Sequence, residues 1–188
     1  MPRGEWRAEE DAFLAGERAK TGRALKEAMG DFIGQLVKPV TLFATFTFDP
    51  LNIRMVGPLV AGDKRAELPL PTVSVWCAGR RFQYFLDHAS EALGRLVVGV
   101  IATEDHRSGQ SHGHGVLGIE GGLVGGEIGT LSAHWRKGRG NGFIRLEEPL
   151  SEEDVTKYCA KYMAKDASDM VFSRSLQEFQ RMMVLPGR

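Results

Sequence analysis

Apolar side chains recur along the chain at two different spacings, and each spacing predicts one kind of element. From Arg7 to Val37 they return every three or four residues, which predicts one or two helices that stop at Pro39. From Val40 to Phe48, threonines alternate with alanine and phenylalanine, which predicts a β-strand. Asp49-Pro50 is a turn signal and is expected to end this strand.

The rest of the chain repeats these two spacings between loops. The stretch from Asn52 to Pro71 is rich in Gly and Pro and is expected to be a long loop. The expected strands are Thr72–Trp76, Arg95–Glu104, His112–Ile119 and Phe143–Leu146, and the expected helices are Arg80–Leu93, Glu127–Lys137 and a last one with Ser151 as its N-cap. This order predicts an α+β fold with an antiparallel sheet. Residues 1–38 are expected to be a helical segment packed on a core made by residues 39–188, in one domain.

Composition places the protein among ordinary globular domains. Its 188 residues are 43% hydrophobic and 26% charged, which suits a single core. No apolar run is long enough for a membrane span, and the charged start at Met1–Asp11 does not resemble a secretory signal. The two cysteines, Cys77 and Cys159, are too few for a disulfide framework. We therefore expect a cytoplasmic protein without a membrane partner.

Charge is balanced overall but locally positive. The formal net charge is +0, which argues against a protein that coats nucleic acid by bulk attraction. Positive side chains nevertheless gather in two places without intervening acids, at Arg136, Lys137, Arg139 and Arg145, and at Lys157, Lys161 and Lys165. These stretches are either contacts for nucleic-acid phosphates or an ordinary solvated loop and helix face.

Two histidines and a carboxylate form a candidate metal site. His112 and His114 are two residues apart on an expected strand, so both imidazoles point to one face. Glu104 ends the preceding strand and can lie beside them if the two strands form a hairpin, with Asp105 and then His106 as alternative ligands. Three such ligands leave open positions on a divalent metal, which catalysis needs. The alternative is a chance histidine pair on a polar face. Because the imidazoles must be neutral to bind, activity is expected to fall as the pH drops through the histidine range.

Tyrosines and lysines share one face of the last expected helix. Tyr158, Lys161, Tyr162 and Lys165 follow the i, i+3, i+4, i+7 spacing of an α-helix. Neighbouring cations favour a phenolate, which is a nucleophile. The alternative is an amphipathic helix whose tyrosines pack on the sheet while the lysines reach water.

Three segments together resemble the HUH endonuclease superfamily of rolling-circle replication initiators. FATFTFD at Phe43–Asp49 resembles its first motif, and EDHRSGQSHGHGVL at Glu104–Leu117 resembles the second, which carries the metal ligands. YCAKYMAK at Tyr158–Lys165 resembles the third, in the two-tyrosine form typical of phage and plasmid initiators. The likeness covers about residues 40–168. One departure is Gly113, where the family has a bulky hydrophobic residue, and it is expected to loosen the packing behind the ligands.

The resemblance implies both a fold and a set of residue roles. The fold is a five-stranded antiparallel sheet like that of an RNA-recognition module, with flanking helices. His112, His114 and Glu104 would bind Mg²⁺ or Mn²⁺. Tyr158 would be the first nucleophile and Tyr162 the second. Lys161 has its usual motif position in the catalytic centre, and Lys165 would contact a phosphate. Apart from the resemblance, the local positive charge predicts DNA contacts at Lys157, Arg136, Lys137 and Arg139.

The implied activity is nicking and rejoining of single-stranded DNA through a 5′-phosphotyrosine, which starts rolling-circle replication of a plasmid or phage. The partner would be single-stranded DNA at an origin. A separate helicase would act with it, because the chain has no G-x-x-x-x-G-K-[ST] motif. A separate polymerase would extend the free 3′-OH. The alternatives are a two-tyrosine transposase of the same superfamily, a non-catalytic module that stacks bases on Phe43, Phe46 and Phe48, and a structural zinc domain, which would need four ligands with thiolates.

Overall fold

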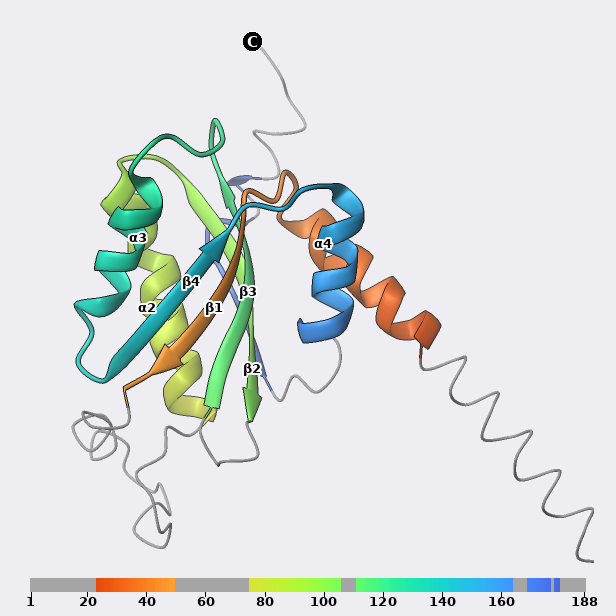
Figure 1. Cartoon of the computed structure of the whole chain (residues 1–188), viewed down its shortest axis with the longest axis horizontal. Helices are drawn as coiled ribbons and strands as arrows, with labels where there is room; N and C mark the ends of the chain where they lie inside the picture. Colours follow the sequence, from red (N-terminus) through yellow and green to blue (C-terminus); the bar gives the residue numbers. More distant parts are fainter. Residues whose placement is uncertain (1–22, 50–74, 106–110, 164–168, 177, 180–188) are drawn as a thin grey trace, which may run out of the picture.

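The computed structural model describes residues 23–49, 75–105, 111–163, 169–176 and 178–179. They form a five-stranded antiparallel sheet between two layers of helices (Figure 1). The strands are β1 (Leu42–Phe48), β2 (Val97–Asp105), β3 (Ser111–Ile119), β4 (Asn141–Glu147) and β5 (Asp169–Phe172), and the helices are residues 23–36, α2 (Val75–Leu93), α3 (Glu127–Arg136), α4 (Glu152–Tyr158) and the π-helical turn η4 (Cys159–Met163). The predicted α+β class with an antiparallel sheet is confirmed.

The sheet order places the candidate metal ligands near its centre. The strands run β4-β1-β3-β2-β5, so β3 is the middle strand and β2 is its neighbour. β2 and β3 pair along their whole length from Val97↔Ile119 to Asp105↔Ser111. β1 pairs with β3 on one side and with β4 on the other. Glu104 on β2 and the two histidines on β3 therefore lie on adjacent strands.

An aromatic core joins one face of the sheet to α2 and α3. The ring of Phe46 on β1 lies 5.2 Å from that of Phe82, 5.1 Å from that of Phe85 and 5.0 Å from that of Trp135. All four side chains are fully buried. Burying such large rings removes much apolar surface from water, so this layer supplies a major part of the hydrophobic stabilisation.

The N-terminal helix and α4 cover part of the opposite face. Gly30 allows them to meet, since a Cβ added there would lie 2.9 Å from both the Thr156 carbonyl oxygen and the Ala160 nitrogen. Ile33 is buried in the core beneath, but Leu25 and Phe32 of the predicted apolar stripe are 67% and 56% exposed. The predicted stripe is therefore only partly buried, because the side of the helix that contains Gly30 packs against α4.

Two elements differ from the sequence-based expectation. Helix α2 begins at Val75, so the short strand expected at Thr72–Trp76 is wrong for its last two residues, and its first three lie outside the described residues. The fifth strand is instead β5, which pairs with β2. With four residues, β5 is too short to show a period in the sequence.

No helix in the described part of the chain combines the length and apolar character that crossing a membrane requires.

A side chain from α2 fills the space behind His112 and His114. Gly113 points to the α2 face, where a Cβ added to it would lie 2.4 Å from the Cζ atom of Phe82. The expectation of loose packing at this position is therefore wrong. The buried Phe82 ring occupies the volume that a bulky residue between the histidines would otherwise take.

We expect Gly113→Val to destabilise the protein by about 1–3 kcal/mol, because its side chain would displace the Phe82 ring. Phe82→Ala alone removes core volume and is also destabilising. In the double variant the two losses should partly cancel, because the new valine enters the space that the ring vacates. Urea unfolding of the three variants measures the coupling. Strictly additive losses would contradict this description of the packing.

Candidate metal centre

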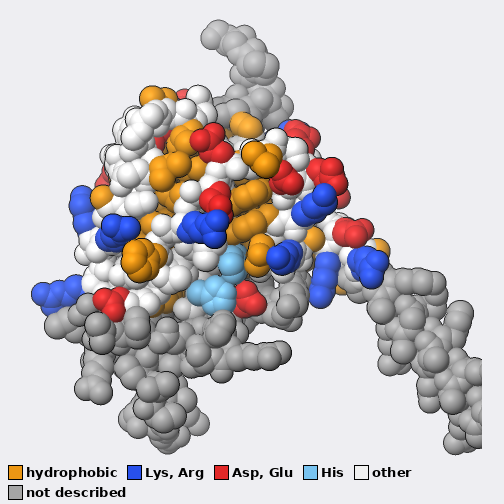
Figure 2. Space-filling model, viewed as in Figure 1, with side chains coloured by type: hydrophobic (Ala, Val, Ile, Leu, Met, Phe, Trp, Pro, Cys, Tyr) orange, Lys and Arg blue, Asp and Glu red, His pale blue; other side chains and the backbone are white. Residues whose placement is uncertain are grey.

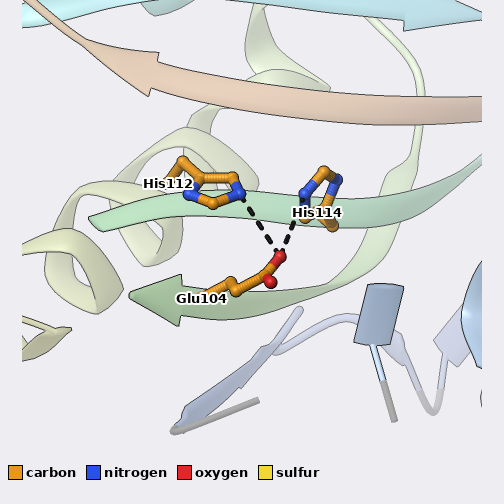
Figure 3. A group of neighbouring side chains, drawn as sticks. All are labelled: Glu104, His112 and His114. Carbon is orange, nitrogen blue, oxygen red and sulfur yellow. Dashed lines mark ion pairs between the residues drawn. The ribbon is translucent and has the colours of Figure 1, made fainter. Parts of the chain in front are cut away.

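The pairing of β2 with β3 brings the three predicted ligands together. Glu104 is the register partner of His112, and His114 lies two residues further along the same face. Glu104 Oε2 is 3.3 Å from His112 Nε2 and 3.4 Å from His114 Nε2 (Figure 3). One ligand atom from each residue lies within 4.8 Å of the other two. The alternative ligand His106 lies outside the described residues, as does the side chain of Asp105.

The cluster is anchored on one side and open on the other. The side chain of His114 is 9% exposed, whereas those of His112 and Glu104 are 22% and 27% exposed. In Figure 2, histidine side chains reach the surface beside an acidic side chain, with Lys and Arg side chains around them. A ligand can therefore approach the three residues from solvent without moving the core.

The donor set fits a divalent metal with free coordination positions. Neighbouring ligands on an octahedral ion stand about 3 Å apart, which is close to the two nitrogen–oxygen distances. Two imidazoles and one carboxylate suit Mn²⁺ better than Mg²⁺, which prefers oxygen ligands. Among the described residues, no fourth His, Cys, Asp or Glu belongs to the cluster. Cys77 and Cys159 are buried in cores on opposite faces of the sheet, so the geometry offers no support for a closed zinc site with thiolates.

Hydrogen bonds behind His114 fix its orientation. Its Nδ1 atom lies 3.3 Å from Thr45 Oγ1 and 3.4 Å from the Tyr158 hydroxyl. The Tyr158 hydroxyl donates its own hydrogen to the Ala44 carbonyl at 2.9 Å, so toward His114 it can act only as an acceptor. When a neutral His114 donates from Nδ1 to these oxygens, its lone pair is on Nε2, the atom that faces Glu104. This is the arrangement that a metal-binding histidine needs.

Burial sets the protonation state of two groups at the site. Burial, followed by the charges of His112 and Lys161, lowers the pKa of His114 to about 4. Burial also raises the pKa of Tyr158 above its ordinary value, so its phenol is protonated at rest. For His114, the predicted loss of the metal-binding form is therefore shifted to a lower pH than the ordinary histidine range.

We expect the metal-free protein to lose stability as the pH falls from about 6.5 to about 4. In this window His114 takes up a proton in the unfolded chain but not in the folded one, so acid favours unfolding. The contribution of this residue is at most about 3 kcal/mol. Urea unfolding in EDTA across this range measures it, and the pH dependence should be smaller in His114→Gln. An equal dependence in both proteins would contradict the assigned burial of a neutral His114.

The two tyrosines lie together beside the cluster, but in different surroundings. Their ring centroids are 5.0 Å apart, as their predicted shared face requires, although the turn between them is π-helical. The Tyr158 ring stacks on Phe43 at 4.3 Å and 4°. The Tyr162 ring stacks on His114 at 4.5 Å and 24°, with Lys161 Nζ 4.6 Å from its centre. The Tyr162 ring thus contacts His114, a candidate metal ligand, through its ring face, while the Tyr158 hydroxyl lies on the Nδ1 side of His114.

The predicted DNA-binding residues do not all come together. Arg136, Lys137 and Arg139 line a cavity of about 770 Å³ at the start of β4. Lys157 instead forms an exposed ion pair with Glu153 at 2.7 Å, and Lys165 lies outside the described residues.

Two residues near the site were missed by the sequence reasoning. Phe143 is 70% exposed, and the Arg136 guanidinium lies 5.6 Å above its ring. Thr45 supports His114 from β1. Thr45 could have been identified as a polar residue at an alternate position of an expected strand. No local pattern could have identified Phe143 as exposed, because a side chain on an edge strand can point to either the core or solvent.

Comparison of the chain with protein-family models, with curated proteins and with solved structures gives no match. The fold and the site therefore define an α+β protein with a three-residue cluster that could hold a metal ion and with two tyrosines beside it. Any function assigned to it rests on this geometry and on the resemblance of its motifs.

Proposed function

We propose that the protein is a metal-dependent endonuclease that nicks and rejoins single-stranded DNA through a tyrosine, as an initiator of rolling-circle replication of a plasmid or phage. The observation that carries the proposal is the contact of Tyr162 with His114, since it places a phenol against an open cluster of two imidazoles and a carboxylate. The resemblance of three motifs to HUH endonucleases supports it. A site that only bound nucleic acid would need neither a metal cluster nor a nucleophile.

His112, His114 and Glu104 would hold the ion. A divalent metal there would supply Lewis acidity to the phosphate that is cleaved. Three neighbouring side chains support this site. Thr45 and Tyr158 hold His114 in its metal-binding tautomer, and Lys161 places a positive charge next to Tyr162.

The covalent step exchanges one phosphodiester bond for another. The Tyr162 oxygen attacks phosphorus and loses its proton, the bond from phosphorus to the 3′ oxygen breaks, and that oxygen leaves and is protonated as a free 3′-OH. The product is a 5′-phosphotyrosine, whose bond energy is conserved, so rejoining needs no ATP. Attack by the 3′-OH reverses the step and releases the tyrosine.

The geometry favours Tyr162 over Tyr158 as the first nucleophile, which reverses the order that the motif resemblance implies. The Tyr158 hydroxyl donates to a main-chain carbonyl and contacts the rear nitrogen of His114. Its ring is held flat against Phe43. Attack by Tyr158 would break both hydrogen bonds and the support of the metal ligand, whereas no such bond holds the Tyr162 hydroxyl among the described residues. Tyr158 acts in this proposal as a positioning residue.

The cavity beside Phe143 is the proposed entry for the strand. An exposed aromatic ring can stack on a base, and Arg136 and Arg139 can contact the flanking phosphates. In contrast, Phe46 and Phe48 are buried and Phe43 is stacked on Tyr158, so the three phenylalanines considered for a purely binding module are not available for bases.

We expect a covalent protein–DNA adduct with single strands and none with linear duplex. The test uses a pool of single-stranded oligonucleotides of random sequence with Mn²⁺, followed by denaturing electrophoresis. A label at the 3′ end should migrate with the protein, because the 5′ phosphate of that fragment becomes linked to tyrosine. A label at the 5′ end should be released on a shorter strand.

EDTA is the matched control and should remove the adduct. A 5′ label that stays on the protein would reverse the proposed polarity. Efficient nicking of fully paired linear duplex by this chain alone, or the absence of any adduct, would overturn the proposed function.

A further inference from the structure

A second cavity lies on the far side of the sheet from the metal cluster. It has a volume of about 800 Å³ and opens between α2 and the end of α3. Both helices pack on the face of the sheet opposite to α4, as Figure 1 shows. The proposed cleavage step does not use this cavity, although Lys137 also lines the cavity proposed as the entry for the strand.

The walls of the cavity are positively charged. Arg80, Arg81 and Lys137 line it, and Glu91 is the one acidic residue among the described residues that line it. Arg81 is partly buried, whereas Arg80 and Lys137 are exposed. The Nη1 atom of Arg81 lies 3.0 Å from the position that a Cβ at Gly138 would take. Arg81 forms no ion pair with any described residue, and burial lowers its pKa. A half-buried cation without a carboxylate partner favours an anionic ligand.

Three polar atoms of residues that line the cavity lack hydrogen-bond partners within the described part of the chain, and His134 Nε2 is one of them. Trp135 is 1% exposed, yet its indole N–H has no acceptor. Asn141 donates from Nδ2 to the Trp135 carbonyl at 2.7 Å, which leaves its buried Oδ1 without a donor. Leaving such atoms unpaired costs free energy, so a ligand that brings both an acceptor and a donor would be stabilised there.

Aromatic rings line the same cavity. Tyr84 is 60% exposed and stacks on His88 with ring centroids 4.1 Å apart and 27° between the planes. His134 continues this stack at 6.4 Å and 17°. Exposed, prearranged rings of this kind are the surfaces on which nucleobases stack.

We propose that this cavity is a nucleotide-binding site, in which Arg81 and Lys137 hold the phosphate, the Tyr84–His88 pair stacks on the base, and Trp135 and Asn141 satisfy polar groups of the ligand. A nucleotide offers a phosphate to a cation, a base to aromatic rings, and polar groups to free donors and acceptors. This one cavity contains a cation, stacked rings, and an unpaired donor and acceptor. The ligand is either a free mononucleotide or a nucleotide within a single strand. The site goes beyond the proposed endonuclease function and does not depend on it.

The test measures binding to the full chain in EDTA, so that the metal cluster does not contribute. One arm titrates dAMP by calorimetry, and the other titrates a fluorescent oligo(dT) by anisotropy. We expect Arg81→Gln and Tyr84→Ala each to weaken dAMP binding about tenfold, which is the loss expected for one charged hydrogen bond or one base stack. Tyr84→Ala changes an exposed side chain, so it remains informative if Arg81→Gln fails to fold.

Two controls isolate the cavity. Arg23→Gln removes an exposed cation from the opposite helical layer and should leave dAMP affinity unchanged. His112→Ala/His114→Ala should also leave it unchanged, because the cluster is on the other face of the sheet. Weaker binding of both dAMP and oligo(dT) in Arg81→Gln identifies a strand-binding site, whereas a loss for dAMP alone identifies a site for free nucleotides.

Three outcomes would overturn the inference: no binding of either ligand to the wild type, affinities within twofold of wild type in both Arg81→Gln and Tyr84→Ala, or dAMP binding that disappears in His112→Ala/His114→Ala. The DNA adduct formed with Mn²⁺ is a separate measurement. Its absence would overturn the endonuclease proposal and leave the nucleotide site standing.

Discussion

Tyr162→Phe is expected to abolish the covalent protein–DNA adduct, while Tyr158→Phe retains it. The substitution at 162 removes the oxygen that would attack phosphorus and leaves the ring that stacks on His114 at 4.5 Å. The substitution at 158 removes a hydroxyl that is already engaged by the Ala44 carbonyl. Electrophoresis of labelled single strands with Mn²⁺ compares the two variants, and peptide mapping of the wild-type adduct identifies the linked residue.

Metal affinity separates a nucleophile from a positioning residue. Tyr158→Phe takes one hydrogen-bond acceptor from His114 Nδ1, although Thr45 remains at 3.3 Å. We therefore expect about tenfold weaker Mn²⁺ binding in Tyr158→Phe and unchanged binding in Tyr162→Phe. Adduct formation by Tyr158→Phe should recover at high Mn²⁺. DNA found chiefly on Tyr158, or an adduct in Tyr162→Phe at wild-type yield, would reverse these roles.

His112→Ala/His114→Ala is expected to lose Mn²⁺ binding by more than about 100-fold, since two of three ligands disappear. The same variant should form no adduct. Calorimetric titration with Mn²⁺ measures the affinity, and circular dichroism checks the fold. Glu104→Ala should also weaken binding, because its carboxylate lies 3.3 and 3.4 Å from the two imidazoles.

His88→Ala/His134→Ala is the matched control for that experiment. It removes two histidines that lie on α2 and α3, away from the cluster, and should leave Mn²⁺ affinity unchanged. Undiminished Mn²⁺ binding in the variant without His112 and His114 would contradict the metal centre. Equal losses in both double variants would indicate unspecific binding to histidines.

Local patterns alone determined several parts of this protein. The alternation from Val40 to Phe48 predicted β1, and the spacing of His112 and His114 predicted that both rings share a face, because side chains on a strand alternate with a period of two. Ser151 was recognised as an N-cap, and its hydroxyl does accept from the Asp154 N–H at 3.1 Å. Each of these properties depends only on neighbours in sequence.

Other parts were decided only by tertiary structure. The pairing of Glu104 with His112 depends on the register of β2 and β3, which the intervening loop leaves undetermined. The hydroxyl of Tyr158 lies behind His114 because of the way α4 packs on the sheet, and Phe82 rather than a strand residue fills the space beside Gly113. The cavity between α2 and α3 likewise joins residues about fifty positions apart. Periodicity specifies which face a side chain is on, but contacts between distant segments depend on how complete elements pack, and that is a property of the whole chain.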